Sequence, residues 1–148
     1  KLVTLIKQQA RLHAVEEGLK VILVDGPPGI GCPVISAFSG ADLALIITEA
    51  TLSGLSDLER ILTTIRHFKL PAVLCINKSD LNPQGSQAIR KYAKKENLIV
   101  LGEIPYDPVF LEAVISGKPV TDTQSDTPAQ QAIHAIWQKT LERLWETK

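Results

Sequence analysis

The sequence predicts a parallel α/β fold, that is, a sheet with helices on both of its faces. Four short apolar runs rich in β-branched residues have the composition of strands that are covered on both faces. They are residues 21–24, 43–47, 72–76 and 98–101. Each run is separated from the next by a segment long enough for a crossover helix. The chain has 148 residues, 45% of them apolar, which suits one compact domain with its own core.

The helices follow from apolar spacing and from capping residues. They are expected at residues 1–18, 33–39, 53–68, 86–96 and 108–116, and in a last segment that begins at Pro128. Gly18 suits a left-handed C-terminal cap, and Thr127 suits an N-cap before Pro128. Apolar residues of the last helix form one stripe that should dock on the sheet: Ile133, Ile136, Trp137, Leu141, Leu144 and Trp145. The polar segment 118–126 is expected to be a surface excursion.

Composition excludes several classes of function. The formal net charge is zero, so the basic excess that nucleic acids and anionic membranes attract is missing. No apolar run spans a bilayer and no leader-like segment opens the chain, which predicts a cytoplasmic protein. The two cysteines, Cys32 and Cys75, form no CxxC pair, so this chain alone is not expected to build a zinc or iron-sulfur site. The chain starts with Lys1 inside an expected helix and contains no methionine, which indicates part of a longer protein.

The run 21–24 ends in an acid and continues into a Gly/Pro turn, Asp25-Gly26-Pro27-Pro28-Gly29. An acid at the end of a buried strand holds Mg²⁺, directly or through water, and Gly29 lets its backbone amide approach a γ-phosphate. The pattern is typical of a Walker B strand that leads into a switch loop; an ordinary acidic turn is the alternative. Nowhere does the chain contain a glycine-rich loop ending in Gly-Lys-Ser/Thr, so the P-loop strand is expected to be lacking.

Two further strand ends carry polar motifs. The run 72–76 leads into Asn77-Lys78-Ser79-Asp80, which has the NKxD form. There the Asp80 carboxylate would pair with two ring-edge donors of guanine, and the Lys78 stem would lie along the base. The run 98–101 leads into Pro105-Tyr106-Asp107, which closes over the same base or is a plain turn. Since ligands of doubly wound sheets bind beyond the carboxyl ends of the strands, these motifs predict one base-binding edge.

Four stretches together resemble a known family: VILVDGPPGIGCPVI, GADLALIITEATLSGLSDLERI, CINKSDLN and GEIPYDPVFLEAVISGKPV. They are similar to the MinD/ParA group of deviant Walker ATPases, and most similar to MinD-superfamily ATPases with an inserted ferredoxin domain (CobQ/CobB/MinD/ParA, cobyrinic acid a,c-diamide synthase-like). The resemblance implies a P-loop NTPase fold of the SIMIBI type, with residues 1–148 as the C-terminal portion of one domain. It implies that the P-loop and the 4Fe-4S clusters belong to a segment upstream of Lys1.

The resemblance also assigns roles to residues. It makes Asp25 the Walker B acid with Mg²⁺, Gly29 the switch glycine, Asn77 the base-contacting residue, and Pro105, Tyr106 and Asp107 the adenine-side loop. This family generally uses ATP, whereas Lys78 and Asp80 complete the guanine signature of related GTPases, so GTP is the alternative.

Cys32 stands beside a predicted helix start, where the helix dipole favours a thiolate. In the related nitrogenase iron protein a cysteine at similar spacing ligates a cluster shared across a dimer, so two copies of Cys32 could hold or sense a metal. The alternative is a small buried residue under a tight turn. Cys75, inside an apolar strand, is expected in the core.

These observations predict the C-terminal half of a dimeric ATPase switch that couples hydrolysis to a partner or an iron-sulfur cluster, inactive on its own. Its expected partners are a second copy or the missing N-terminal half, and a redox protein or metalloprotein. An ATP-dependent amide ligase and a non-catalytic interaction module are the alternatives.

Overall fold

The computed structural model describes residues 2–27, 29, 31–122 and 126–146. Its elements are α1 (Leu2–Glu16), α2 (Cys32–Phe38), β1 (Ala44–Glu49), α3 (Leu52–His67), β2 (Ala72–Asn77), α4 (Pro83–Lys95), β3 (Ile99–Ile104), α5 (Val109–Ser116), the 3₁₀ turn η1 (Val120–Asp122) and α6 (Pro128–Glu146). Lys1, Pro28 and the part of the expected surface excursion at 123–125 lie outside the described residues.

The strands form one parallel sheet in the order β1-β2-β3. Ala44 pairs with Ala72, and the register runs on to Glu49 opposite Asn77. Asn77 in turn lies opposite Ile104 of β3, after an irregularity between Leu74 and Cys75. The carboxyl ends of all three strands therefore lie in a row along one edge of the sheet.

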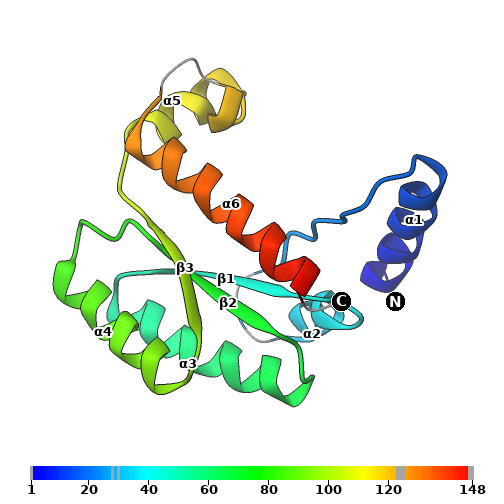
Figure 1. Ribbon diagram of the computed structural model, residues 1–148, viewed down its shortest axis with the longest axis horizontal. Helices are drawn as coiled ribbons and strands as arrows, with labels where there is room; N and C mark the ends of the chain where they lie inside the picture. Colours follow the sequence, from blue (N-terminus) through cyan, green and yellow to red (C-terminus); the bar gives the residue numbers. More distant parts are fainter. Residues whose placement is uncertain (1, 28, 30, 123–125, 147–148) are drawn as a thin grey trace.

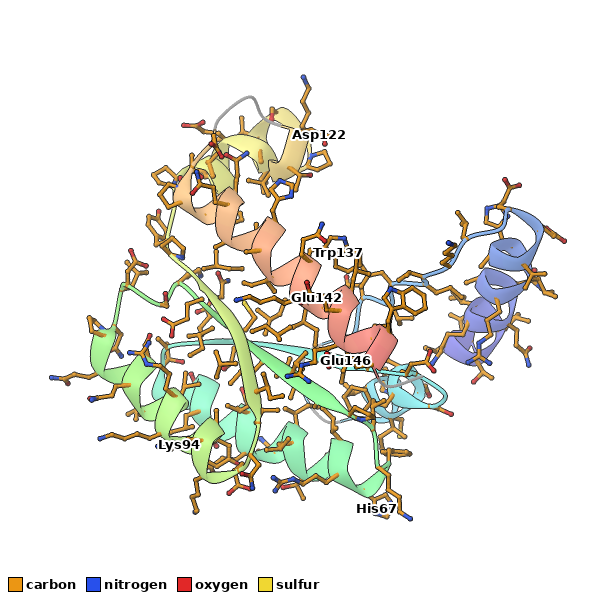
Figure 2. All side chains as sticks on the ribbon, viewed as in Figure 1. His67, Lys94, Asp122, Trp137, Glu142 and Glu146 are labelled. Carbon is orange, nitrogen blue, oxygen red and sulfur yellow. The ribbon has the colours of Figure 1, made fainter. Side chains whose placement is uncertain are left out.

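Helices cover both faces of this sheet, as predicted (Figure 1). On one face, α3 and α4 bury a cluster built around Leu58, Leu74 and Ile89. On the other face, α6 packs over Val73 and Cys75 of β2 and over Leu101 and Ile104 of β3. Figure 2 shows the same separation, with Trp137, Glu142 and Glu146 along α6 and with Lys94 and His67 on the opposite side of the sheet. The α/β class is thereby confirmed.

Local caps fix where the helices begin. Thr51 accepts a hydrogen bond from the Gly54 amide at 2.9 Å, so α3 starts at Leu52. Asn82 accepts a hydrogen bond from the Gly85 amide at 3.0 Å, and Pro83 occupies the first helical position. Helix α4 therefore starts three residues before Ser86, where the sequence predicted its start.

The cap of α6 is reciprocal. The Thr127 amide donates to Gln130 Oε1 at 3.0 Å, and the Gln130 amide donates to Thr127 Oγ1 at 3.4 Å. The predicted N-cap is thus confirmed.

The prediction of a first strand at residues 21–24 is wrong. These residues form an unpaired connection between α1 and α2, with Leu23 78% exposed. A strand forms only where a neighbour satisfies its backbone groups, and the described residues contain no strand that pairs with this run. Its apolar composition therefore did not suffice to place it in the sheet.

Helix α1 lies apart from the sheet and contacts α2 (Figure 1). Lys7 Nζ donates to the carbonyl groups of Ala37 at 2.8 Å and Ser39 at 2.6 Å, at the C-terminal end of α2. Desolvation of Lys7, followed by the charge of Arg11, lowers the pKa of this ammonium group. Gly18 ends the segment with φ +65°, as the predicted left-handed cap requires. No helix among the described residues has the length and apolarity needed to cross a membrane.

Candidate functional site

Three loops meet at the carboxyl edge of the sheet: residues 50–51 after β1, 78–82 after β2 and 105–108 after β3. The middle loop is the centre of the arrangement because its side chains and backbone bond to both neighbours. The edge on which the sequence places the base site is therefore one connected surface.

Two hydrogen bonds join the β2 loop to the end of β3 and to the loop that follows it. The Ser79 amide donates to the Ile104 carbonyl oxygen at 3.1 Å. Asp80 Oδ1 accepts from the Tyr106 amide at 2.7 Å, across 26 residues of sequence. The distance is typical of a charge-assisted bond, and it ties two of the predicted site segments together.

Two further contacts join the β2 loop to the end of β1. Lys78 Nζ lies 2.7 Å from Glu49 Oε1, and both side chains are close to half exposed. Asn82 Nδ2 donates to the Ala50 carbonyl oxygen at 2.8 Å, while its Oδ1 caps α4. Asn82 thus fixes the β1 loop and the start of α4 at once.

Asn77 lies at the centre of this edge, between Glu49 and Ile104 in the strand register. Its Oδ1 accepts from the Lys78 amide at 3.0 Å, which orients the side-chain amide. Lys78 itself adopts φ +51°, a left-handed conformation that turns the chain sharply after the strand. A half-buried amide in this position offers both a donor and an acceptor to a ligand.

The structure does not bring the predicted metal-side residues into this network. Asp25 lies exposed on the unpaired connection, and Gly29 lies farther along it with φ +92°. Neither they nor Cys32 take part in the contacts that join the three loops. This follows from the missing strand pairing, since a strand at residues 21–24 would have carried Asp25 to the same edge.

The two cysteines differ in environment. Cys32 is the first residue of α2 and is exposed, so the expectation of a buried residue under a tight turn is wrong. Cys75 is fully buried as predicted, and burial, with a smaller contribution from the charge of Glu103, raises the pKa of its thiol to about 11. Within the described residues, no group of three or more His, Cys, Asp and Glu side chains could hold a metal ion.

A surface hollow of about 230 Å³ lies elsewhere, between β3 and α6. Lys139 Nζ donates there to the Leu101 carbonyl oxygen at 2.9 Å, and Arg143 pairs with Glu146 at 2.7 Å. Because both cationic side chains that line this hollow, Lys139 and Arg143, already have partners, it offers little free positive charge to an anionic ligand, and the loop edge is the better candidate.

Sequence reasoning missed Glu49, Asn82 and Ser86 as parts of this edge. Ser86 Oγ donates to the Ser79 carbonyl oxygen at 2.6 Å and is almost fully buried. The Asn82-Pro83 pair, a typical helix start, was the signal available for Asn82. Nothing local marked Glu49, because its contact depends on the strand register.

The fold is that of P-loop NTPases of the MinD/ParA type, as solved structures of known proteins show. The chain superposes on a chain of the MinC:MinD cell division protein complex of Aquifex aeolicus with a TM-score of 0.79 and 22% identity, covering 95% of this chain and 59% of that one. For the septum site-determining protein MinD with Mg-ADP from Pyrococcus horikoshii, the TM-score is 0.70 and the identity 20%, covering 86% and 52%. At these identities the likeness establishes the fold.

The chain belongs to the ParA family of NUBPL iron-transfer P-loop NTPases, whose family model matches residues 3–141. Among its relatives, the uncharacterized protein MJ0578 of Methanocaldococcus jannaschii is 38% identical over 82 residues, 55% of this chain and 28% of that protein. The uncharacterized ATP-binding protein MJ0547 of the same organism is 25% identical over 142 residues, covering 96% and 54%. The iron-sulfur cluster transfer protein NUBPL of Dictyostelium discoideum is 28% identical over 138 residues, covering 85% and 43%. The chain thus spans about half or less of these relatives' lengths.

Proposed function

We propose that this chain is the C-terminal part of a nucleotide-dependent switch ATPase and supplies its purine-binding edge. The observation that carries the proposal is the convergence of three strand-end loops around Asn77, joined by the contacts of Lys78, Asp80 and Asn82. A ligand at the carboxyl edge of a parallel sheet meets such loops first. Membership of a P-loop NTPase family supports the same conclusion.

The proposed base is adenine. The edge of adenine presents a donor at N6 beside an acceptor at N7, and a side-chain amide such as that of Asn77 matches this pair. Pro105, Tyr106 and Asp107 would close over the base from the neighbouring loop. The name of the relative MJ0547, an ATP-binding protein, supports ATP over GTP. In this proposal the Lys78 ammonium stays on Glu49, and its aliphatic stem borders the base.

Asp25 and Gly29 are proposed to serve the phosphate side once residues 21–24 pair within a larger sheet. The Asp25 carboxylate would hold Mg²⁺ through water, and the Gly29 amide would approach the γ-phosphate. Bound Mg²⁺ neutralises charge on the phosphate oxygens. The left-handed φ of Gly29 supports a turn that only glycine adopts without strain. Lacking a Gly-Lys-Ser/Thr loop, the chain of 148 residues by itself should bind nucleotide weakly and hydrolyse none.

The test is a titration of the full-length protein with fluorescent mant-ATP and mant-GTP in the presence of Mg²⁺. Asn77→Ala should weaken mant-ATP binding roughly 10- to 100-fold, the value of one bidentate base contact. Asp25→Asn should abolish hydrolysis while binding persists. Gln87→Ala, at an exposed position of α4, is the matched control and should behave as the unaltered protein. Unchanged mant-ATP binding by Asn77→Ala would refute the assignment of the base site.

The family description further supports an iron-sulfur cargo and a partner that receives it. Since the described residues contain no metal-ligand cluster, a cluster at Cys32 would need ligands from a second copy. Light scattering with and without ATP tests the proposed dimer, and anaerobic iron and sulfide loading of Cys32→Ala tests the role of the thiol. A monomer with ATP, or undiminished cluster absorbance in Cys32→Ala, would remove that part of the proposal.

A further inference from the structure

The acid of the NKxD motif faces the protein's own backbone. Asp80 Oδ1 receives the Tyr106 amide at 2.7 Å, and this is the only hydrogen bond among the described residues in which a side chain of the β2 loop holds the 105–107 segment. We propose that Asp80 is a positioning residue that fastens the adenine-side loop to the β2 loop, and is not a group that reads the base. The proposal rests on the proposed function, because it assigns these loops to one nucleotide site.

The 105–107 segment is held from both directions. Asp80 fixes the Tyr106 amide from the β2 side, and on the α5 side Asp107 Oδ1 accepts from the Val109 amide at 2.9 Å. The Ser79 amide adds a parallel bond to the Ile104 carbonyl oxygen, two residues before Tyr106. Three hydrogen bonds thus anchor the 105–107 segment and its two ends. A loop fixed before the ligand arrives loses less conformational entropy when it closes on that ligand.

Recognition of guanine would require a different orientation of the Asp80 carboxylate. Both carboxylate oxygens would have to accept from the two ring-edge donors of the base, in one plane. In the structure, Oδ1 is already directed at a backbone amide on the neighbouring loop. An NKxD acid used in this way no longer indicates GTP, which removes the conflict between the motif and the ATP-binding relative MJ0547.

Two substitutions separate the roles. Asp80→Asn keeps a side-chain oxygen that accepts from the Tyr106 amide, whereas Asp80→Ala removes it. A base-reading carboxylate would tolerate neither, because asparagine presents an amide donor to the ring-edge donors of guanine. Asp57→Ala is the control, since Asp57 is exposed on α3 and forms one weak ion pair, with Arg60 at 3.7 Å, in the described part of the chain.

The first measurement is hydrogen exchange of the Tyr106 amide in the full-length protein without nucleotide. Exchange should become about tenfold faster, or more, in Asp80→Ala, and should stay within about threefold of the unaltered protein in Asp80→Asn and Asp57→Ala. The second is the dissociation constant for mant-ATP and mant-GTP with Mg²⁺. Asp80→Ala should weaken mant-ATP binding roughly three- to tenfold. The ratio of the two dissociation constants should not change in any variant.

Unchanged exchange of Tyr106 in Asp80→Ala overturns the proposal, and so does a change of more than about tenfold in the ATP-to-GTP ratio of Asp80→Asn. If the unaltered protein binds neither nucleotide, the proposed function fails, while the exchange measurement still decides whether Asp80 holds the loop. The two failures are therefore distinguishable.

Discussion

Gly102 of β3 lies directly against Ile136 of α6. A Cβ atom at position 102 would stand 2.6 Å from Ile136 Cγ1 and 3.1 Å from its Cδ1. Ile136 is buried and β-branched, so its side chain has little freedom to move away. This close approach sets how deeply α6 docks on the sheet.

Gly102→Ala should therefore destabilise the protein by about 1–3 kcal/mol, because overpacking a filled core outweighs the entropy gained by replacing glycine. Urea unfolding of Gly102→Ala measures this cost. In an Ile136→Ala background, which removes Cγ1 and Cδ1, Gly102→Ala should lower the free energy of unfolding only slightly. Equal costs in the two backgrounds would show that the close contact is not responsible.

Gly85 makes a comparable approach at the candidate site. A Cβ there would lie 2.3 Å from the Ala50 carbonyl oxygen, a backbone atom that a side-chain rotation cannot move. We expect Gly85→Ala to push the start of α4 away from the β1 loop and to lower the free energy of unfolding by about 2 kcal/mol or more. Gln87→Ala, exposed on the same helix, should change it by less than about 0.5 kcal/mol. A neutral Gly85→Ala variant would contradict the packing of α4 against this loop.

Most elements could be predicted from the sequence because their signals are local. The runs at 43–47, 72–76 and 98–101 became β1, β2 and β3 with ends shifted by three residues or fewer, since strand composition and flanking turns suffice for buried parallel strands. Residues 21–24 have the same composition and are not a strand, because pairing depends on a neighbour that composition does not reveal.

The candidate site likewise has parts that the sequence predicts and parts that it does not. The strand-end rule brought Asn77 and Tyr106 to one edge, which follows from topology and local motifs. The hydrogen bond between Asp80 and Tyr106 spans 26 residues of sequence and depends on the register of β2 and β3. No local sequence pattern predicts it. For Asp25 the sequence supplied a motif, but its place at the same edge stays a prediction.

Lys69 follows α3 in a left-handed conformation, φ +53°, and Asn97 follows α4 with φ +54°. Lysine is disfavoured there, whereas asparagine tolerates the region and glycine adopts it freely. Lys69→Gly should stabilise the protein by about 0.5–1 kcal/mol, measured as a rise in the urea midpoint at constant slope. The matched change Asn97→Gly should give a gain close to zero. A loss of stability in Lys69→Gly would contradict the prediction.

The thiol of Cys75 should make stability fall at alkaline pH. Burial raises its pKa from 9.0 to about 11, so above pH 9 the unfolded chain releases a proton that the folded protein retains. The unfolded state is then favoured, and the loss grows as pH rises from 9 and levels off above about 11. Between pH 8 and pH 10 the loss should reach about 1 kcal/mol.

Cys75→Ala isolates this contribution, because other groups titrate equally in both proteins. Chemical denaturation at pH 8 and pH 10 should show a smaller loss in Cys75→Ala by that same amount. In the folded protein at pH 8, a thiol reagent should modify exposed Cys32 rapidly and Cys75 only after unfolding, since the reactive thiolate of Cys75 is suppressed and the side chain is fully buried. Rapid labelling of Cys75 in a folded Cys32→Ala variant would contradict its place beneath α6.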